Sequence, residues 1–206
     1  LLAAGLGTRL LPHTERKPKC LIDIGGKPLL LWHVEKLQSL GIGHLLINLF
    51  HEGEQIKNFL GDGSKWSMSI DYLHEKELLG TGGGIGNALR SIGNEPFIAM
   101  SGDVWTDFDL SNLSLNDGSL AHLILIENPP GNPKGDMYLD KGKVNSLGKG
   151  RSLTFSGLAL IDPRLFIGAK SGEYDLWQEI LLPASNKGQV SAEVYEGYLV
   201  NINTIE

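Results

Sequence analysis

The chain has 206 residues, of which 41% are hydrophobic and 20% are charged, and its formal net charge is −6. These values are typical of a globular protein that buries a substantial core, and the acidic balance argues against nucleic acid as the main partner. The single cysteine, Cys20, excludes an internal disulfide and a cysteine-based zinc site.

No apolar run reaches the length of a membrane span, and no segment has the pattern of a signal peptide. The reducing cytoplasm is therefore the simplest setting, with no membrane contact. The chain begins at Leu1 rather than Met and stops at Glu206, just after a predicted strand. We expect one domain over residues 1–206, trimmed at both ends, that works as a monomer or a homodimer.

The first 75 residues alternate between strands and helices. Residues 1–4 are apolar but too few for a helix, and they predict the end of a buried strand. Helices are predicted at 29–40, with Pro28 at the first helical position, and at 53–60; strands are predicted at 44–50 and 69–74. Short loops between alternating strands and helices favour a parallel sheet covered by helices. We therefore expect an α/β fold, a single-domain Rossmann-like α/β/α sandwich with a mixed, mainly parallel central sheet.

The remaining residues continue with further strands and few helices. Strands are predicted at 96–101, 121–127, 153–161 and 190–202, a hairpin at 135–146, and helices at 175–185 and after Thr204. Asp107 and Asp109 are expected to be turn and cap residues.

A glycine-rich turn follows the first predicted strand. Gly5 and Gly7 let the backbone turn tightly and direct its N–H groups toward an anion. Thr8 adds a hydroxyl, and Arg9 adds a guanidinium suited to phosphate. The segment from Arg9 to Lys27 holds five Lys or Arg residues against two Asp or Glu. A basic segment beside a glycine turn, in an acidic chain, predicts a polyphosphate site.

The glycines alone do not identify the site. Leu10 stands where the dinucleotide fingerprint has its third glycine, and the Gly-Lys-Ser/Thr of the P-loop is missing, so an ordinary strand–loop turn stays equally open. The longer pattern is more specific: Leu-Ala-Ala-Gly-x-Gly-Thr-Arg-Leu-x-Pro at 2–12, Lys-Pro-Lys-x-Leu at 17–21 and Gly-Gly-Lys-Pro at 25–28. It resembles the signature of the sugar-1-phosphate nucleotidyltransferases.

This resemblance implies a GT-A-like nucleotidyltransferase fold and an Mg²⁺-assisted reaction between a nucleoside triphosphate and a sugar 1-phosphate that releases pyrophosphate. It implies that Arg9, Lys19 and Asp103 are catalytic, with Arg9 on the leaving pyrophosphate and Lys19 bridging the two reacting phosphates. The residues implied to bind the nucleotide are Leu2, Ala3, Ala4, Gly5, Gly7, Thr8, Arg9, Thr81, Gly82 and Gly83.

Later segments, at residues 75–85, 102–107, 128–129, 134–136 and 153–157, are similar to family members that use UTP and N-acetylmuramate 1-phosphate in peptidoglycan recycling. Guanylyltransferases of mannose 1-phosphate and thymidylyltransferases of glucose 1-phosphate share most of these motifs and stay open. A Rossmann-type dehydrogenase is disfavoured because no acid stands at the end of the second strand, where Phe50 and His51 precede Glu52.

Three consecutive glycines, at 82–84, predict a loop because glycine is costly inside a helix. Thr81 is expected to cap a helix that runs through residues 87–91. A flexible turn and a loop that lies against a flat ligand such as a base both stay open. In the resembled family a similar loop holds the nucleobase and sugar, and Thr81, Gly82 and Gly83 match it.

Asp103 lies just beyond the strand predicted at 96–101, where α/β folds place ligands, and carboxylate oxygens suit Mg²⁺. A turn or cap role is the alternative. The resemblance implies that Asp103 is a metal ligand, and that Asn201 stands where the family has a second metal-binding aspartate. An amide coordinates without charge, so we expect a weakened metal site. Three explanations for Asn201 stay open: an enzyme with a weaker metal site, an inactive relative that only binds, and an introduced change.

Four further residues are candidates for the sugar phosphate, in addition to Lys19. Thr154 and Ser156 interrupt an apolar strand on one face, and Lys134 and Asp136 lie in a preceding loop. Solvent-facing positions are an equally open explanation for the strand residues, and a solvated loop lysine is an open explanation for Lys134.

Overall fold

The computed structural model describes residues 1–116 and 118–202. The chain divides into two compact units: Leu1–Leu78 with Ser101–Thr106 and Val200–Glu206, and Leu79–Met100 with Asp107–Leu199. Each unit combines helices with strands, so the predicted α/β class is confirmed. The helix predicted after Thr204 lies outside the described residues.

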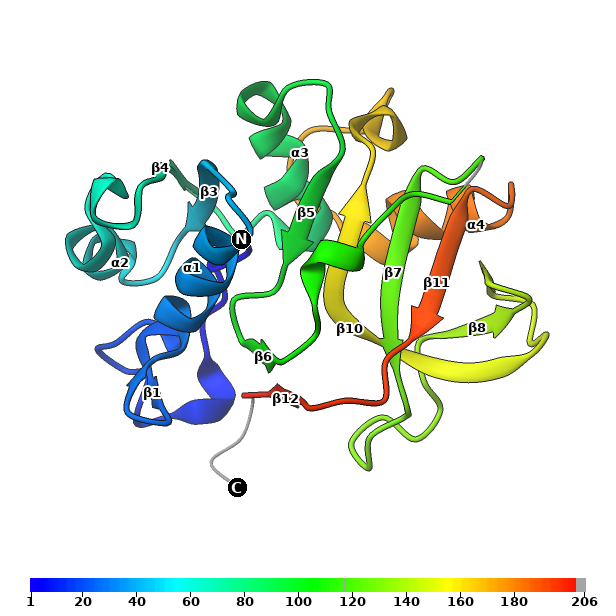
Figure 1. The fold of residues 1–206 in the computed structure, drawn as a ribbon, viewed down its shortest axis with the longest axis horizontal. Helices are drawn as coiled ribbons and strands as arrows, with labels where there is room; N and C mark the ends of the chain where they lie inside the picture. Colours follow the sequence, from blue (N-terminus) through cyan, green and yellow to red (C-terminus); the bar gives the residue numbers. More distant parts are fainter. Residues whose placement is uncertain (117, 203–206) are drawn as a thin grey trace. The chain divides into compact units, whose positions relative to one another are not determined.

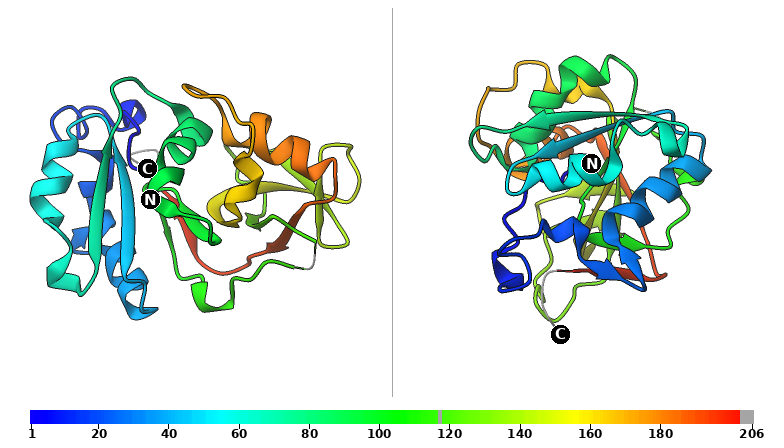
Figure 2. Two further views of the ribbon diagram at one scale, coloured as in Figure 1. Left: turned by 90° about the horizontal axis from the view of Figure 1, so that it is seen from above. Right: turned by 90° about the vertical axis from the view of Figure 1, so that its left-hand side faces the viewer.

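Parallel strands form the centre of the first unit (Figure 1). β3 (His44–Leu49) pairs in parallel with β4 (Ser69–His74) along its whole length. Leu2 makes parallel bridges to both Asn48 and Ser101, so the start of the chain lies between β3 and residue 101. Figure 2 shows α1 (Leu29–Ser39) and α2 (Gly53–Leu60) beside this pair. The smaller elements are β1 (Asp23–Ile24) with β2 (Lys27–Pro28), β6 (Val104–Thr106) with β12 (Leu199–Asn201), and 3-10 helices at Thr8–Leu10, Lys19–Leu21 and Ser64–Trp66.

The helix α1 shows why the sequence pattern was informative here. Its buried residues recur three to four positions apart, which gives one apolar face; they are Leu29, Leu30, His33, Val34 and Leu37. Pro28 is the N-cap rather than the first helical residue, and the helix ends one residue before the predicted end. Differences of one residue are ordinary at helix ends, where the hydrogen bonds fray.

A six-stranded sheet forms the centre of the second unit, in the order β5-β10-β7-β11-β9-β8 (Figure 1). Its strands are β5 (Phe97–Met100), β7 (Ala121–Ile126), β8 (Met137–Asp140), β9 (Lys143–Asn145), β10 (Arg151–Ile161) and β11 (Val190–Val194). The helices are α3 (Gly80–Ile92), a π-helical turn at Trp177–Leu181 that continues into α4 (Leu182–Ser185), and 3-10 turns at Leu110–Asn112 and Pro163–Phe166. Leu123, Leu125, Leu153 and Ile161 are fully buried in this sheet.

The mixed sheet is confirmed, but the parallel majority holds only in the first unit. In the six-stranded sheet, β7 and β11 are parallel, whereas the other pairings among the described strands are antiparallel. The predicted hairpin at 135–146 exists as β8 and β9, with Lys141 and Gly142 at its turn, both at positive φ. A hairpin returns the chain antiparallel, which explains the direction of β8 against β9.

Two further predicted elements differ in detail. The strand predicted at 190–202 is two strands, β11 and β12, which belong to different sheets. The helix predicted at 175–185 begins at Trp177 with a π-helical turn before Pro183, which has no N–H to donate to the preceding turn. None of the helices in residues 1–116 and 118–202 combines the length and apolar character needed to cross a bilayer.

Candidate active site

The glycine turn after Leu2–Ala4 has the geometry of an anion-binding loop. Gly7 has φ 64°, and a Cβ there would lie 2.9 Å from Thr14 Cγ2, so the position requires glycine. Buried Thr14 donates its hydroxyl to the Gly7 carbonyl at 2.7 Å, which fixes the turn. The N–H groups of Gly5, Leu6 and Gly7 donate to no acceptor in the part of the chain that the structure describes. They are therefore available to an anion.

A buried polar chain fixes the strand that leads into this loop. The Ala3 N–H donates to Asn48 Oδ1 at 2.7 Å, and Asn48 Nδ2 donates to Glu75 Oε1 at 2.7 Å. Asn48 and Glu75 are 7% and 8% exposed. Sequence reasoning missed both residues; the signal was an asparagine inside an apolar strand, because a buried amide needs partners. The Ala3 N–H is thus already used within the chain.

Lys19 and Asp103 form the central charge pair of the first unit. Lys19 Nζ lies 2.7 Å from Asp103 Oδ2, and the two side chains are 11% and 31% exposed. Lys19 belongs to the 3-10 helix that follows Pro18, whereas Asp103 lies 84 positions later. The structure therefore brings together two of the three predicted catalytic residues. The third, Arg9, lies exposed in the 3-10 turn after Gly7.

The backbone before Asp103 is tightly constrained. The Gly102 N–H donates to the Leu2 carbonyl at 2.8 Å, and a Cβ at Gly102 would lie 2.8 Å from that same oxygen. His33 of α1 faces Gly102: burial lowers the pKa of its imidazole to about 4, and the Gly102 carbonyl acts in the opposite direction. The buried ring of His33 is therefore neutral near pH 7. His33 is another residue that the sequence did not single out.

Asn201 lies on the strand next to Asp103. The N–H of Ile202 donates to the Asp103 carbonyl at 2.8 Å, and β12 pairs with β6, which begins at Val104. The predicted metal ligands Asp103 and Asn201 are thus neighbours along two paired segments of the first unit. No three His, Cys, Asp or Glu side chains gather into a metal-binding cluster within residues 1–116 and 118–202.

The glycine run predicted as a loop is instead the first turn of α3, and this corrects the prediction. Gly82, Gly83 and Gly84 are buried inside the helix, and Thr81 gives no side-chain cap. The Thr81 hydroxyl accepts the Leu176 N–H at 3.0 Å. The cost of helical glycine is offset by close packing of Gly82 and Gly83 against residues 172–176, which a side chain at either glycine would prevent.

Tyr174 also hydrogen-bonds the backbone groups at the start of α3. The Tyr174 carbonyl accepts from Gly82 N at 3.1 Å and Gly83 N at 3.2 Å, and the Tyr174 N–H donates to the Leu79 carbonyl. These two glycine N–H groups, which the helix itself cannot satisfy, are therefore bound within the second unit. A nucleotide contact of Thr81, Gly82 and Gly83 stays a prediction.

The four candidate sugar residues lie along β10 and the loop before β8. Thr154 Oγ1 donates to Asn128 Oδ1 at 2.9 Å, and Asp136 accepts from the Phe155 N–H and the Asn132 amide. Ser156 is only 3% exposed, and its hydroxyl accepts the Leu158 N–H, so the alternative of a solvent-facing position is excluded for Ser156. The cause is the β-bulge around Gly157, which interrupts the alternation of β10.

Lys134 lies in the loop before β8. The residue is exposed, and its carbonyl accepts the Ser152 hydroxyl at 2.6 Å. The loop therefore has a fixed backbone near Lys134. A sugar-phosphate contact of Lys134, Asp136, Thr154 or Ser156 stays a prediction.

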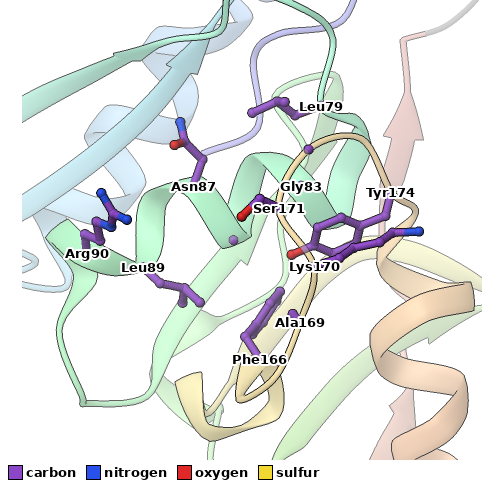
Figure 3. Close-up of a pocket in the computed structure, with 12 residues that line it drawn as sticks. Leu79, Gly83, Asn87, Leu89, Arg90, Phe166, Ala169, Lys170, Ser171 and Tyr174 are labelled. Atoms are coloured by element: carbon purple, nitrogen blue, oxygen red, sulfur yellow. The ribbon is translucent and has the colours of Figure 1, made fainter.

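A cavity of about 290 Å³ lies in the second unit, between α3 and residues 166–174 (Figure 3). It is lined by Leu79, Gly83, Gly86, Asn87, Leu89, Arg90, Phe166, Ala169, Lys170, Ser171, Gly172 and Tyr174. The Tyr174 ring points toward α3 in this view, and its hydroxyl is buried with no hydrogen-bond partner in the described chain. Sequence analysis did not predict this cavity.

Comparison with known proteins agrees with the geometry. Residues 1–123 match the model of the nucleotidyl transferase family, so the match covers the loop, Lys19 and Asp103. The chain belongs to this family. An N-acetylmuramate alpha-1-phosphate uridylyltransferase from Neisseria meningitidis is 38% identical over 100% of this chain and 92% of its own length. A D-glycero-alpha-D-manno-heptose 1-phosphate guanylyltransferase from Campylobacter jejuni is 29% identical over 100% and 94%.

A solved structure supports the same assignment. HddC from Yersinia pseudotuberculosis, in complex with GMP-PN, matches with a TM-score of 0.79 and 27% identity over 99% of this chain and 92% of its own. The chain is therefore a sugar-1-phosphate nucleotidyltransferase by family, and the members of this family are enzymes. The sequence signature at 2–12 is confirmed as that of the family.

The residues of this nucleotidyltransferase fit a divalent cation only in part. Asp103 offers a carboxylate that is 31% exposed, and Asn201, on the neighbouring backbone segment, has an uncharged amide. Hard cations such as Mg²⁺ often bind through one or two carboxylates together with substrate phosphates and water. The donor set therefore fits a cation that takes most of its ligands from the substrate.

Proposed function

We propose that the chain transfers a uridylyl group from UTP to N-acetylmuramate 1-phosphate and releases pyrophosphate. The Lys19–Asp103 pair carries this proposal, because it places a partly buried cation and a carboxylate in the unit that also contains the Gly5 and Gly7 N–H groups, which no described residue accepts. The choice of substrates is supported by the full-length similarity to the Neisseria uridylyltransferase. Those substrates are intracellular metabolites, so we further propose a cytoplasmic role in peptidoglycan recycling, as a monomer or homodimer.

In the proposed reaction, a phosphate oxygen of the sugar 1-phosphate attacks the α-phosphorus of UTP in line. The new P–O bond forms as the bond to the β-phosphate oxygen breaks, and pyrophosphate leaves with the electron pair. No covalent bond to the protein is needed, so the residues act by position and charge. Lys19 stabilises charge on the α-phosphate and the incoming phosphate, and Arg9 neutralises the leaving pyrophosphate.

The loop residues Gly5, Gly7 and Thr8 would donate their N–H groups to the triphosphate. Asp103 and Asn201 would hold Mg²⁺, which supplies positive charge at the phosphates when bound. In the second unit, Thr81, Gly82 and Gly83 would border the base, and Lys134 and Thr154 would contact the sugar phosphate. Gly82 and Gly83 are buried and their N–H groups bind the Tyr174 carbonyl, so neither N–H would donate to a base.

A guanylyltransferase is the second candidate activity. The Campylobacter relative is named for guanylyl transfer, and HddC was solved with a guanine nucleotide analogue. A thymidylyltransferase remains a third possibility. A protein that binds nucleotide sugar without turnover is the alternative of another class, because Asn201 removes one expected carboxylate.

The test is pyrophosphate release with N-acetylmuramate 1-phosphate and UTP, GTP or dTTP in Mg²⁺ buffer, run beside an Asn201→Asp variant. We expect turnover with UTP by the unmodified chain. Turnover with GTP alone would replace the uridylyl assignment. If only Asn201→Asp turns over, the chemistry is right but binding is the main activity of this chain. If neither protein releases pyrophosphate with any of the three, the proposed substrate pair is wrong.

A further inference from the structure

Tyr174 fits into a recess that glycines create along α3. A Cβ at Gly82 would lie 2.5 Å from Tyr174 Cδ2, and a Cβ at Gly86 would lie 2.3 Å from Tyr174 Oη. A Cβ at Gly83 would meet the Gly172 carbonyl at 2.2 Å. Contacts this short do not occur with real side chains, so the first two turns of α3 and residues 172–174 are shaped for each other. Figure 3 shows the Tyr174 ring directed at the helix.

Hydrogen bonds hold the same two segments together. The Tyr174 carbonyl accepts from Gly82 N and Gly83 N, at 3.1 and 3.2 Å, and its N–H donates to the Leu79 carbonyl at 3.0 Å. The Leu176 N–H donates to Thr81 Oγ1 at 3.0 Å. Tyr174 therefore binds the backbone at Leu79, Gly82 and Gly83, and Leu176 binds the side chain of Thr81.

Glycine is the residue that loses most order when contacts are removed, because it has the widest choice of backbone conformations. A start of α3 made largely of glycine would therefore not hold one shape by its own propensity. The Tyr174 ring and backbone supply the missing constraint. Residues Thr81–Gly83 are the part of the second unit that the proposed function assigns to the nucleotide.

We propose that Tyr174 is a positioning residue for the nucleoside triphosphate, acting through the glycine-rich start of α3. This inference rests on the proposed function. The ring, rather than the hydroxyl, carries the effect, because Oη is buried without a partner in the described residues while the ring fills the space beside Gly82. Tyr174 touches no reacting atom in this scheme, and it sets the conformation of residues that contact the nucleotide.

The first experiment compares Tyr174→Phe with Tyr174→Leu by titration of UTP without sugar phosphate, followed by steady-state kinetics. We expect Phe to bind UTP within twofold of the unmodified chain, because it keeps the ring. We expect Leu to weaken UTP binding at least tenfold, while the KM for the sugar 1-phosphate changes less than twofold. If Tyr174 only stabilised the fold, Tyr174→Leu would raise both the Kd for UTP and the KM for the sugar 1-phosphate, or lower the amount of folded protein. Tyr72→Leu, a change of the same kind in β4 of the first unit, is the matched control and should leave UTP binding unchanged.

The second experiment uses the contact between Gly86 and the hydroxyl. Gly86→Ala places a methyl group 2.3 Å from Tyr174 Oη, but the next atom, Cζ, is 3.4 Å away. The single change should weaken UTP binding at least fivefold by pushing Tyr174 from its recess. In combination with Tyr174→Phe the clash is gone, and binding should return to within twofold. Alanine is otherwise favourable in a helix, so a general loss of folding would not show this recovery.

These outcomes separate the inference from the proposed function. If the chain binds GTP or dTTP instead of UTP, the substrate assignment fails, and the same variants are titrated with the nucleotide that binds. If Tyr174→Leu binds nucleotide normally, or if Gly86→Ala is not rescued by Tyr174→Phe, the inference is overturned. Absence of binding to all three triphosphates would overturn both.

Discussion

Replacing Lys19 by methionine tests the centre of the proposed site, since it removes the ammonium but keeps a flexible side chain of similar length. The Nζ–Oδ2 distance to Asp103 is 2.7 Å, with Lys19 only 11% exposed. At an effective dielectric constant of about 20, the direct attraction at this distance is about 6 kcal/mol before desolvation is subtracted. The net value is much smaller, but a partly buried cation at this position stabilises phosphate charge far better than water does.

Two opposite effects are expected from Lys19→Met. Turnover should fall by about 10²–10³-fold, or roughly 3–4 kcal/mol, as when one charge-stabilising group is lost from an active site. Binding of a divalent cation to the protein alone should instead become about tenfold tighter, or roughly 1.4 kcal/mol, because Asp103 loses the ammonium that competes with the metal. A general disruption of the site would weaken both properties.

The assay for metal binding uses Mn²⁺ in the absence of substrates, with the free ion measured by its electron paramagnetic resonance signal. Pyrophosphate release gives the turnover. Lys17→Met is the matched control, because it removes the same charge two residues away from Lys19 and should change neither quantity more than twofold. Turnover of Lys19→Met within threefold of the unmodified chain would remove Lys19 from the mechanism. Mn²⁺ binding no tighter than in the control would refute the competition between ammonium and metal.

Three further outcomes are expected. Asn201→Asp adds the missing carboxylate and should raise both turnover and Mn²⁺ affinity several-fold; a decrease in either would contradict the assigned metal position. Gly7→Ala should destabilise the fold by about 1–2 kcal/mol in urea melts, because φ of Gly7 is 64° and the new Cβ would lie too close to Thr14. Gly5→Ala should not destabilise the fold, because a Cβ at Gly5 would have no atom within 4 Å. The Arg164 side chain hydrogen-bonds Asp162 and lowers its carboxyl pKa. The stabilisation is present above the unfolded pKa of Asp162, about 3.9, and is lost as the pH falls through the pKa of the folded state. The difference in unfolding free energy between the unmodified chain and Arg164→Met should therefore shrink on acidification. A difference that does not change with pH would refute this linkage.

The sequence was most informative where local chemistry alone determines the structure. The turn at Gly7 could be predicted because a turn of this kind depends on its own few residues, whereas the binding of an anion by Gly7 and Arg9 stays a prediction. The partners of the loop could not be recognised, since Asn48 and Glu75 reach it only through pairing of distant strands. The parallel majority failed in the second unit for a similar reason, because strand direction depends on connections that short-range patterns do not specify.

The glycines at 82–84 show how composition can mislead. Read alone, three glycines predict a loop, and nothing near them in the sequence indicates a partner. The partner is Tyr174, about 90 positions later. Its ring fills the space beside Gly82, and its carbonyl accepts the N–H groups of Gly82 and Gly83. A glycine run can therefore mark close packing of two protein segments as well as close approach of a ligand, and only tertiary structure separates the two.

The charges around Asp103 bear on whether the metal binds alone or together with the nucleotide. Lys19 neutralises the carboxylate of Asp103, and Asn201 adds no charge, so this pair offers no net negative charge to a free cation. A divalent ion gains little by replacing an ammonium at a neutral pair, since the desolvation of both groups must be repaid by attraction. A triphosphate changes this balance, because it brings negative charge that Lys19 and the cation can share. The arrangement therefore favours entry of the metal together with the nucleotide, and an aspartate at position 201 would relax that order.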